Sequence, residues 1–374
     1  MAHGGVCVGR APDGRVVFVR HALPGEQVRV VVTEERRSYL RADAVEVLRA
    51  SAARVEPPCP WARPGRCGGC DWQHVTLDEQ RRLKAAVVRE QLLRLAGVDV
   101  DVSVLPVPGD DDGLGWRTRM RFAVDSDGRA GLRRSRSHAI EPIGDCLIAH
   151  PRIGAAEVVA ARWPGAEAIE VEVTAAGMRT MVAHPPGPAR GERRTERACG
   201  RDWAVPVGGF WQVHPGASDR LVETVLELAA PQPDDRCLDL YAGVGLFTDA
   251  LASRTSEPVV AVELDARASA AAAENVPAAT VVTARVEGWL GQQQGDGFDV
   301  VVLDPPRRGA GAAVVDAIAG LGPRVVCYVA CDPASLARDV KTFAAHGYRL
   351  AQLRAFDLFP MTAHVECVGL LERT

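Results

Sequence analysis

The chain has 374 residues, of which 47% are hydrophobic and 25% charged, and its net charge is −4. These fractions are ordinary for a soluble globular protein, and the length allows two or three domains. No apolar run reaches the roughly 20 residues that span a bilayer, and no secretory signal is apparent. We therefore expect a cytoplasmic protein, in which ten cysteines indicate metal, redox or catalytic use rather than a disulfide framework.

Residues 1–50 predict a small all-β module. Turn signals at Asp13-Gly14 and Pro24-Gly25 separate short runs rich in β-branched residues, at 16–19, 28–32 and 42–48. Short strands at this spacing are typical of a small β-barrel.

Residues 51–205 predict a central α+β domain with a cluster of cysteines. Cys59, Cys67 and Cys70 follow the spacing CX7CX2C, and the next cysteine downstream is Cys146. Four thiolates suit either Zn²⁺ or an iron–sulfur cluster, and the spacing alone does not choose between them. A redox-active CXXC pair is a third interpretation, although no thioredoxin-like βαβ pattern surrounds it.

The same region predicts an amphipathic helix over 77–96, ended by Gly97, and a strand over 116–124. Alternation along this strand places three guanidinium groups on one face, those of Arg117, Arg119 and Arg121. Guanidinium groups suit phosphate binding, so this face is a candidate RNA contact. The alternative is an ordinary solvated sheet face.

Residues 206–374 predict a Rossmann-like α/β domain. A strand at 237–240 leads into a glycine-rich turn, and a second strand at 259–262 ends at Glu263. Glycines let a ligand approach the backbone, and an acidic residue at the end of the second strand can bond ribose hydroxyls. The turn lacks the full GXGXXG of dinucleotide-binding proteins. The pattern therefore favours S-adenosylmethionine (SAM) as the ligand.

Two further strands end in reactive side chains. The strand at 298–303 ends at Asp304-Pro305-Pro306, and the strand at 325–330 ends at Cys331. Ligands and catalytic residues collect at such strand ends in open α/β sheets, so Cys331 is a candidate nucleophile. Arg307 stands where amino-group methyltransferases often have a base-stacking aromatic residue, which argues against N-methylation. Glu366 is a carboxylate able to remove a proton.

At this point the chain resembles the uracil-C5 RNA methyltransferases (the TrmA/RlmD/RumA group), over nearly its whole length. The first module resembles the TRAM domain, an OB-like RNA-binding barrel, and the four cysteines match in order. Five motifs add to the likeness: GFWQV at 209–213, LDLYAGVGLFT at 238–248, VVLDPPRRG at 301–309, YVACDPASLARDV at 328–340 and FPMTAHVE at 359–366.

The resemblance implies transfer of a methyl group from SAM to C5 of an RNA uridine. The barrel and the cysteines resemble the rRNA branch, which favours 23S rRNA, with tRNA as the alternative substrate. The resemblance makes Cys331 the nucleophile, which adds to C6, and Glu366 the base. It implies SAM contacts from Gln212, Tyr241, Glu263 and Asp304, and a [4Fe–4S] cluster on Cys59, Cys67, Cys70 and Cys146, with structural zinc as the alternative. We expect a monomer that binds RNA and no membrane.

Two departures from the family pattern bear on the site. Ala330-Cys331-Asp332-Pro333 replaces the usual Ser-Cys-Asn-Pro, and Met361-Thr362-Ala363-His364 replaces the usual Gln-Thr-x-His. An acid beside the nucleophile raises a thiol pKa unless it is paired or points away. Two rival functions are a SAM-dependent methyltransferase for a small molecule, and a non-enzymatic RNA-binding or iron–sulfur sensing protein.

Overall fold

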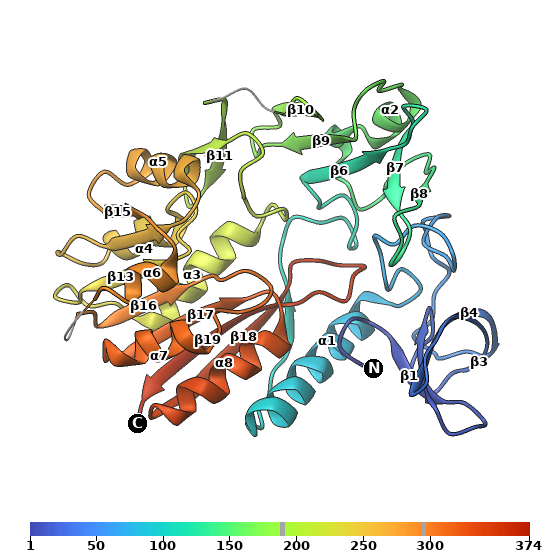
Figure 1. The fold of residues 1–374 in the computed structure, drawn as a ribbon, viewed down its shortest axis with the longest axis horizontal. Helices are drawn as coiled ribbons and strands as arrows, with labels where there is room; N and C mark the ends of the chain where they lie inside the picture. The colour runs from blue at the N-terminus through green and yellow to red at the C-terminus, as the bar shows by residue number, and fades with distance from the viewer. Residues whose placement is uncertain (188–190, 294–296) are drawn as a thin grey trace.

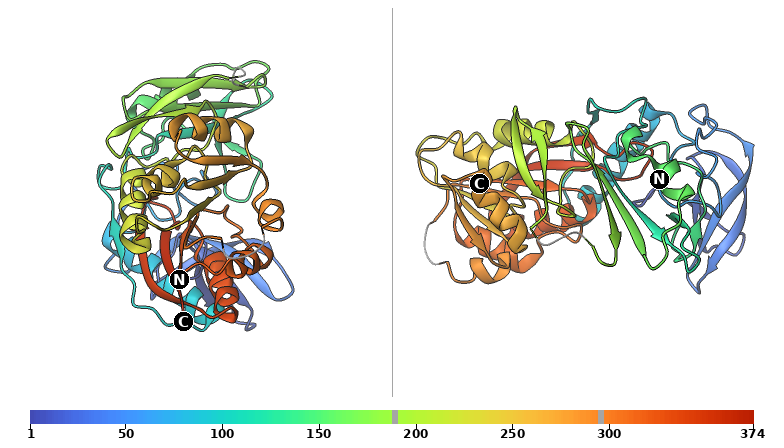
Figure 2. Two further views of the ribbon diagram at one scale, coloured as in Figure 1. Left: turned by 90° about the vertical axis from the view of Figure 1, so that its left-hand side faces the viewer. Right: turned by 90° about the horizontal axis from the view of Figure 1, so that it is seen from above.

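The computed structural model describes residues 1–187, 191–293 and 297–374. Its strands form sheets of four, five, two and eight strands (Figure 1). Figure 2 shows the four-stranded sheet and the eight-stranded sheet at opposite ends of the molecule. Within the described ranges, no helix is long and apolar enough to cross a membrane.

The four-stranded sheet has the order β1-β2-β4-β3, with β2 and β4 parallel. Its core consists of alternate residues, among them Val17, Val19, Leu40 and Ala42, as expected for a sheet that buries one face. The three predicted strands are confirmed as β2 Val16–Arg20, β3 Gln27–Glu35 and β4 Tyr39–Arg49. A fourth strand, β1 Cys7–Arg10, lies outside the predicted set.

The predicted helix over 77–96 is present as α1 (Leu77–Gln91), continued by one π-helical turn, η1 (Leu92–Ala96). It ends at Gly97, whose φ of 72° is left-handed. Leu83 and Leu92 are fully buried. Through this apolar side, α1 and η1 pack against helix α8 (Pro333–Ala345) of the eight-stranded layer.

The five-stranded sheet has the order β10-β9-β6-β7-β8. The predicted strand over 116–124 begins later, at Arg119, because residue 117 forms an isolated bridge with Ala149 instead. A hairpin of β11 and β12 leads on to the last sheet. The bounds are β6 Arg119–Val124, β7 Ala130–Arg133, β8 Ile140–Glu141, η2 Pro151–Ile153, α2 Ala155–Ala160, β9 Ala168–Val173, β10 Arg179–His184, β11 Arg193–Ala198 and β12 Arg201–Pro206.

The eight-stranded sheet has the order β15-β14-β13-β16-β17-β19-β18-β5. Its first five strands are parallel, whereas β19 runs antiparallel between β17 and β18. The strands are β5 Val104–Pro106, β13 Cys237–Leu240, β14 Val260–Glu263, β15 Thr280–Thr283, β16 Val300–Leu303, β17 Val325–Ala330, β18 Tyr348–Asp357 and β19 Glu366–Arg373.

Helices cover both faces of this sheet, which confirms the predicted Rossmann-like architecture. Along β16, Val300 and Val302 face the layer of α3, α4 and α5, whereas Val301 and Leu303 face that of α6, α7, α8 and α1. A parallel sheet buried on both faces explains the continuous apolar runs of its strands. The remaining bounds are α3 Ala217–Ala229, α4 Leu246–Ala252, α5 Ala266–Asn275, α6 Val286–Leu290 and α7 Ala312–Gly320.

Candidate active site

The carboxyl ends of the parallel strands open into a cavity of about 570 Å³. Residues at or just beyond the ends of β13, β14, β16 and β17 line it, as the topology of an open α/β sheet requires. All six residues predicted to bind SAM or to catalyse the reaction lie on this cavity: Gln212, Tyr241, Glu263, Asp304, Cys331 and Glu366.

The glycine-rich turn after β13 is tied to the end of β14 by Glu263. Its Oε2 accepts a hydrogen bond from the Gly243 N–H at 2.9 Å, and its Oε1 accepts one from the Asp265 N–H at 2.7 Å. A Cβ on Gly243 would meet no atom within 4 Å, so the turn leaves open space at the cavity. Carboxylate oxygens keep further lone pairs, so Glu263 remains able to accept ligand hydroxyls.

Cys331 and Glu366 are brought together by strand register. In the antiparallel pair β17 and β19, Ala330 lies opposite Cys367. One residue further along, Cys331 leaves β17 where Glu366 begins β19. Both side chains line the same cavity as Asp304, which follows the end of the neighbouring strand β16.

Burial and neighbouring charges raise the pKa values of these groups. Burial first, and then Glu366 and Asp304, raise the pKa of Cys331 to about 12, while Arg307 acts in the opposite direction. Burial and Asp304 raise the pKa of Glu366 well above its ordinary value, again against Arg307. Burial raises the pKa of Asp304 to about 7. Arg307 is thus the cation that favours the ionised forms of both predicted catalytic groups.

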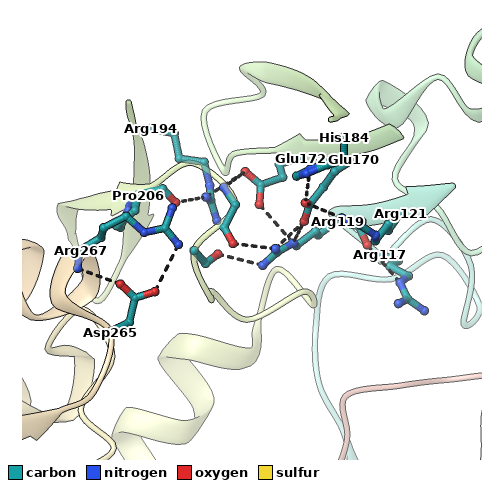
Figure 3. A network of polar contacts seen from close by, with 12 residues as sticks. Arg117, Arg119, Arg121, Glu170, Glu172, His184, Arg194, Pro206, Asp265 and Arg267 are labelled. Atoms are coloured by element: carbon teal, nitrogen blue, oxygen red, sulfur yellow. Dashed lines mark hydrogen bonds and ion pairs between the residues drawn. The ribbon is translucent and has the colours of Figure 1, made fainter. Parts of the chain in front are cut away.

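The segment that leads to Gln212 is held at residues 206–209 by Arg119 and Arg194, whose contacts are drawn in Figure 3. Arg119 donates to the carbonyl oxygens of Gly208 and Gly209 at 2.9 and 2.8 Å and pairs with Glu170 and Glu172. From β11, Arg194 pairs with Glu172 and donates to the carbonyl oxygen of Pro206.

The predicted row of three phosphate-binding arginines is therefore not what the structure shows. Arg119 is engaged inside the molecule, and Arg117 lies outside β6 and lines the cavity. Arg121 is 56% exposed, although Glu170 lies 3.6 Å from it. Sequence alternation located the arginines correctly, but it gave no information on the glutamates opposite them in β9.

The four predicted cluster ligands line a second cavity of about 570 Å³. Cys59, Cys67 and Cys70 are buried, Cys146 is half-buried, and none forms a disulfide. Burial raises the pKa of Cys146 to about 11. In the described part of the chain, no three His, Cys, Asp or Glu side chains are placed as a ready metal-binding group. Arg117 lines both this cavity and the first one.

Comparison with known proteins identifies the family. Family models match residues 2–45 (TRAM domain), 215–321 (methyltransferase small domain) and 293–374 (tRNA (uracil-5-)-methyltransferase). An uncharacterized RNA methyltransferase of Streptomyces avermitilis is 46% identical over all of this chain and 96% of its own length. A 23S rRNA (uracil(1939)-C(5))-methyltransferase of Alkalilimnicola ehrlichii is 34% identical, covering 96% of this chain and 92% of its own. The chain belongs to the uracil-C5 RNA methyltransferase family.

As a member of this family, the chain is a SAM-dependent RNA (uracil-5-)-methyltransferase. Its fold matches that of the Pyrococcus abyssi tRNA (uracil-54, C5)-methyltransferase, solved in complex with S-adenosyl-L-homocysteine. The TM-score is 0.71 at 23% identity, over 98% of this chain and all of the other.

Two residues at the site of this methyltransferase were not singled out from the sequence as site residues. Asp239, within β13, is buried and accepts a hydrogen bond from the Thr248 hydroxyl at 2.6 Å. Burial raises its pKa to about 7. His3 pairs with Asp332, the acid beside Cys331, at 2.8 Å. The place of Asp239 in the strand before the glycine-rich turn is a local signal that could have marked it. No local signal marks His3.

Replacing Arg307 with Met should slow alkylation of Cys331. Loss of the guanidinium removes the charge that lowers the pKa of this thiol, so the thiolate fraction falls by roughly 3- to 10-fold at a given pH below the pKa. The measurement is the rate of iodoacetamide labelling of the Cys331 peptide by mass spectrometry, across a pH series. Arg308→Met, at the adjacent exposed arginine, is the matched control and should leave the rate unchanged. Equal rates in both variants would contradict the assignment.

Proposed function

We propose that this enzyme methylates C5 of a uridine in 23S rRNA through a covalent bond between Cys331 Sγ and C6 of the base. The observation that carries the proposal is the register of β17 and β19, which puts Cys331 and Glu366 side by side on the cavity of the strand ends. A nucleophile and a base on one cavity are what this chemistry needs.

The thiolate of Cys331 adds to C6 and thereby makes C5 nucleophilic, which divides one difficult step into easier ones. SAM, when bound, supplies an electrophilic methyl group to C5. Glu366 then takes the proton from C5 onto a carboxylate oxygen, and elimination releases Cys331 and the methylated base. Burial raises the pKa values of both groups and Arg307 opposes this shift, so the charge of Arg307 favours the reactive thiolate and carboxylate.

The residues of the cavity fit SAM chemically. Carboxylates at Glu263 and Asp304 suit an amine, a sulfonium and ribose hydroxyls, and the ring of Tyr241 and the amide of Gln212 offer further contacts. Phe210 lies on the same cavity and is 65% exposed. An exposed aromatic on the same cavity as the thiol suits a base that has left its stack, as chemistry on C6 requires.

The choice of 23S rRNA is supported by two relatives named as 23S rRNA (uracil(1939)-C(5))-methyltransferases. The second, from Chromohalobacter salexigens, is 33% identical over the whole of this chain. A tRNA uridine is the alternative substrate, which the name of the C-terminal family model favours.

We also propose that Cys59, Cys67, Cys70 and Cys146 hold a [4Fe–4S] cluster, with zinc as the alternative. Four free thiols on one cavity match the ligand number and chemistry of such a cluster. Since their side chains form no joint ligand group as placed, binding requires them to turn toward a common centre, and Gly68 and Gly69 give the backbone that freedom. The cluster would join residues 59–70 to residue 146 and stabilise this part of the fold.

Cys331→Ala should abolish formation of 5-methyluridine, because Cys331 is the only cysteine among the described residues that line the cavity of the strand ends. Glu366→Gln should still permit methyl transfer but trap a covalent RNA–protein adduct, visible as a shifted band on denaturing gels. Cys199→Ala, at an exposed cysteine outside the cavity, is the control and should retain full activity. Normal turnover by Cys331→Ala would defeat the mechanism.

Deleting the gene should remove 5-methyluridine from rRNA and leave it in tRNA. The measurement is mass-spectrometric nucleoside analysis of the two purified RNA pools, with the wild-type gene restored as control. Loss from tRNA alone would keep the chemistry and overturn the substrate choice. No loss from either pool would contradict the proposed function.

Anaerobically purified enzyme should contain about four iron atoms per chain and absorb broadly in the visible range. Cys70→Ser should lose most of this iron, because a buried ligand thiolate is missing, whereas Cys199→Ser should retain it. The measurements are the iron and zinc content per chain and the visible absorption spectrum of each variant. About one zinc atom per chain would instead favour the structural zinc site.

A further inference from the structure

Residues 2–6 form a tight turn that packs against the loop before β19, which contains Ala363. The Ala2 N–H donates to the Val6 carbonyl at 2.8 Å, and Gly4 and Gly5 have φ values of 85° and 77°. The Gly5 carbonyl accepts a hydrogen bond from the Trp72 indole at 3.0 Å. A Cβ on Gly5 would lie 2.6 Å from that of Ala363, so the turn has no room to move inward.

This turn presents His3 to the residue beside the nucleophile. His3 Nε2 lies 2.8 Å from Asp332 Oδ2. The other carboxylate oxygen, Oδ1, accepts the Ser335 N–H at 2.8 Å and caps helix α8. Asp332 is thus held on one side by the barrel module and on the other by the helix that follows Cys331.

We propose that His3 is a positioning residue for the nucleophile, which pairs with Asp332 so that the carboxylate beside Cys331 is neutralised and the turn into α8 is fixed. The inference rests on the proposed role of Cys331. It explains how this chain tolerates an acid where the family pattern has asparagine, because an unpaired carboxylate there would oppose formation of the thiolate.

The surrounding charges are compatible with this pairing. The hydrogen bond that His3 donates to Asp332 raises the pKa of His3, against burial and Arg338. Although burial opposes it, the contacts with His3 and Ser335 lower the pKa of Asp332 to about 2. Asp332 also acts on His364 and Cys367. In both groups, burial is the largest cause of the pKa shift. Glu366, Asp304 and Arg307 are the charges that act most strongly on Cys331 itself.

The pair has a defined pH range. A histidine whose pKa is raised contributes stability that is complete below its ordinary pKa of 6.5 and is lost as pH rises through the raised value. An aspartate whose pKa is lowered contributes stability above its ordinary pKa of 3.8, lost as pH falls through about 2. The ion pair is therefore complete between these two ordinary values and weakens in alkaline solution.

The test measures iodoacetamide labelling of Cys331 in the full-length enzyme, without RNA or SAM, for His3→Ala, Asp332→Asn and the double variant. We expect His3→Ala to slow labelling roughly 3- to 10-fold near neutral pH, by raising the thiol pKa. Asp332→Asn removes the charge that needs neutralising, so adding His3→Ala to it should change the rate by less than about 2-fold.

Two further variants separate charge from contact and guard against misfolding. His3→Gln can still donate a hydrogen bond but carries no charge, so its labelling rate should match that of His3→Ala. His138→Ala, at an exposed histidine far from the site in sequence, should behave like the wild type, and circular dichroism should confirm that each variant is folded.

An unchanged rate in His3→Ala would overturn the proposal, as would an equal slowing in the wild-type and Asp332→Asn backgrounds. Because labelling uses neither substrate, these outcomes are independent of the proposed function. Activity of Cys331→Ala would defeat the proposed function whatever the labelling shows.

Discussion

The antiparallel insertion of β19 between β17 and β18 is the constraint on which the active site depends. In a purely parallel sheet, all strands end at the same edge, and Glu366 at the beginning of β19 would lie at the opposite edge from Cys331. Reversal of this one strand brings the beginning of β19 to the end of β17. The proposed nucleophile and base therefore meet through backbone pairing, which brings their backbone positions together.

The reversed strand needs a loop across the cavity, and the N-terminal half of the chain supports that loop. Lys84 of α1 is fully buried and bonds Asp357 at 2.5 Å and the Phe359 carbonyl at 3.0 Å. Gln80 accepts the Met361 N–H, and the Met361 carbonyl accepts the backbone N–H groups of residues 71 and 72. A buried cation left without its partner is costly, so these contacts make the loop conformation strongly specified.

Local patterns predicted most of this architecture, because β-branched runs, turns and helix stops act over a few residues. Cys331, Glu263 and Asp304 could be placed at strand ends for that reason, and the structure puts all three on one cavity. The pairing of His3 with Asp332, the glutamates opposite Arg119 and the position of β5 depend on residues far apart in the chain, so no local pattern marks them. The predicted domain boundaries after residues 50 and 205 remain predictions.

Strand β5 gives the molecule an unusual folding requirement. Val104, Leu105 and Pro106 pair with the end of β18, although the chain builds a whole second sheet between the two strands. All other strands of the eight-stranded sheet follow β5 in the chain. During synthesis, β5 is therefore made before the strand with which it pairs. Such long-range pairing slows folding and makes half-made chains prone to association. A truncation that removes β5 would leave an open edge on β18, which makes the C-terminal half a poor candidate for expression alone.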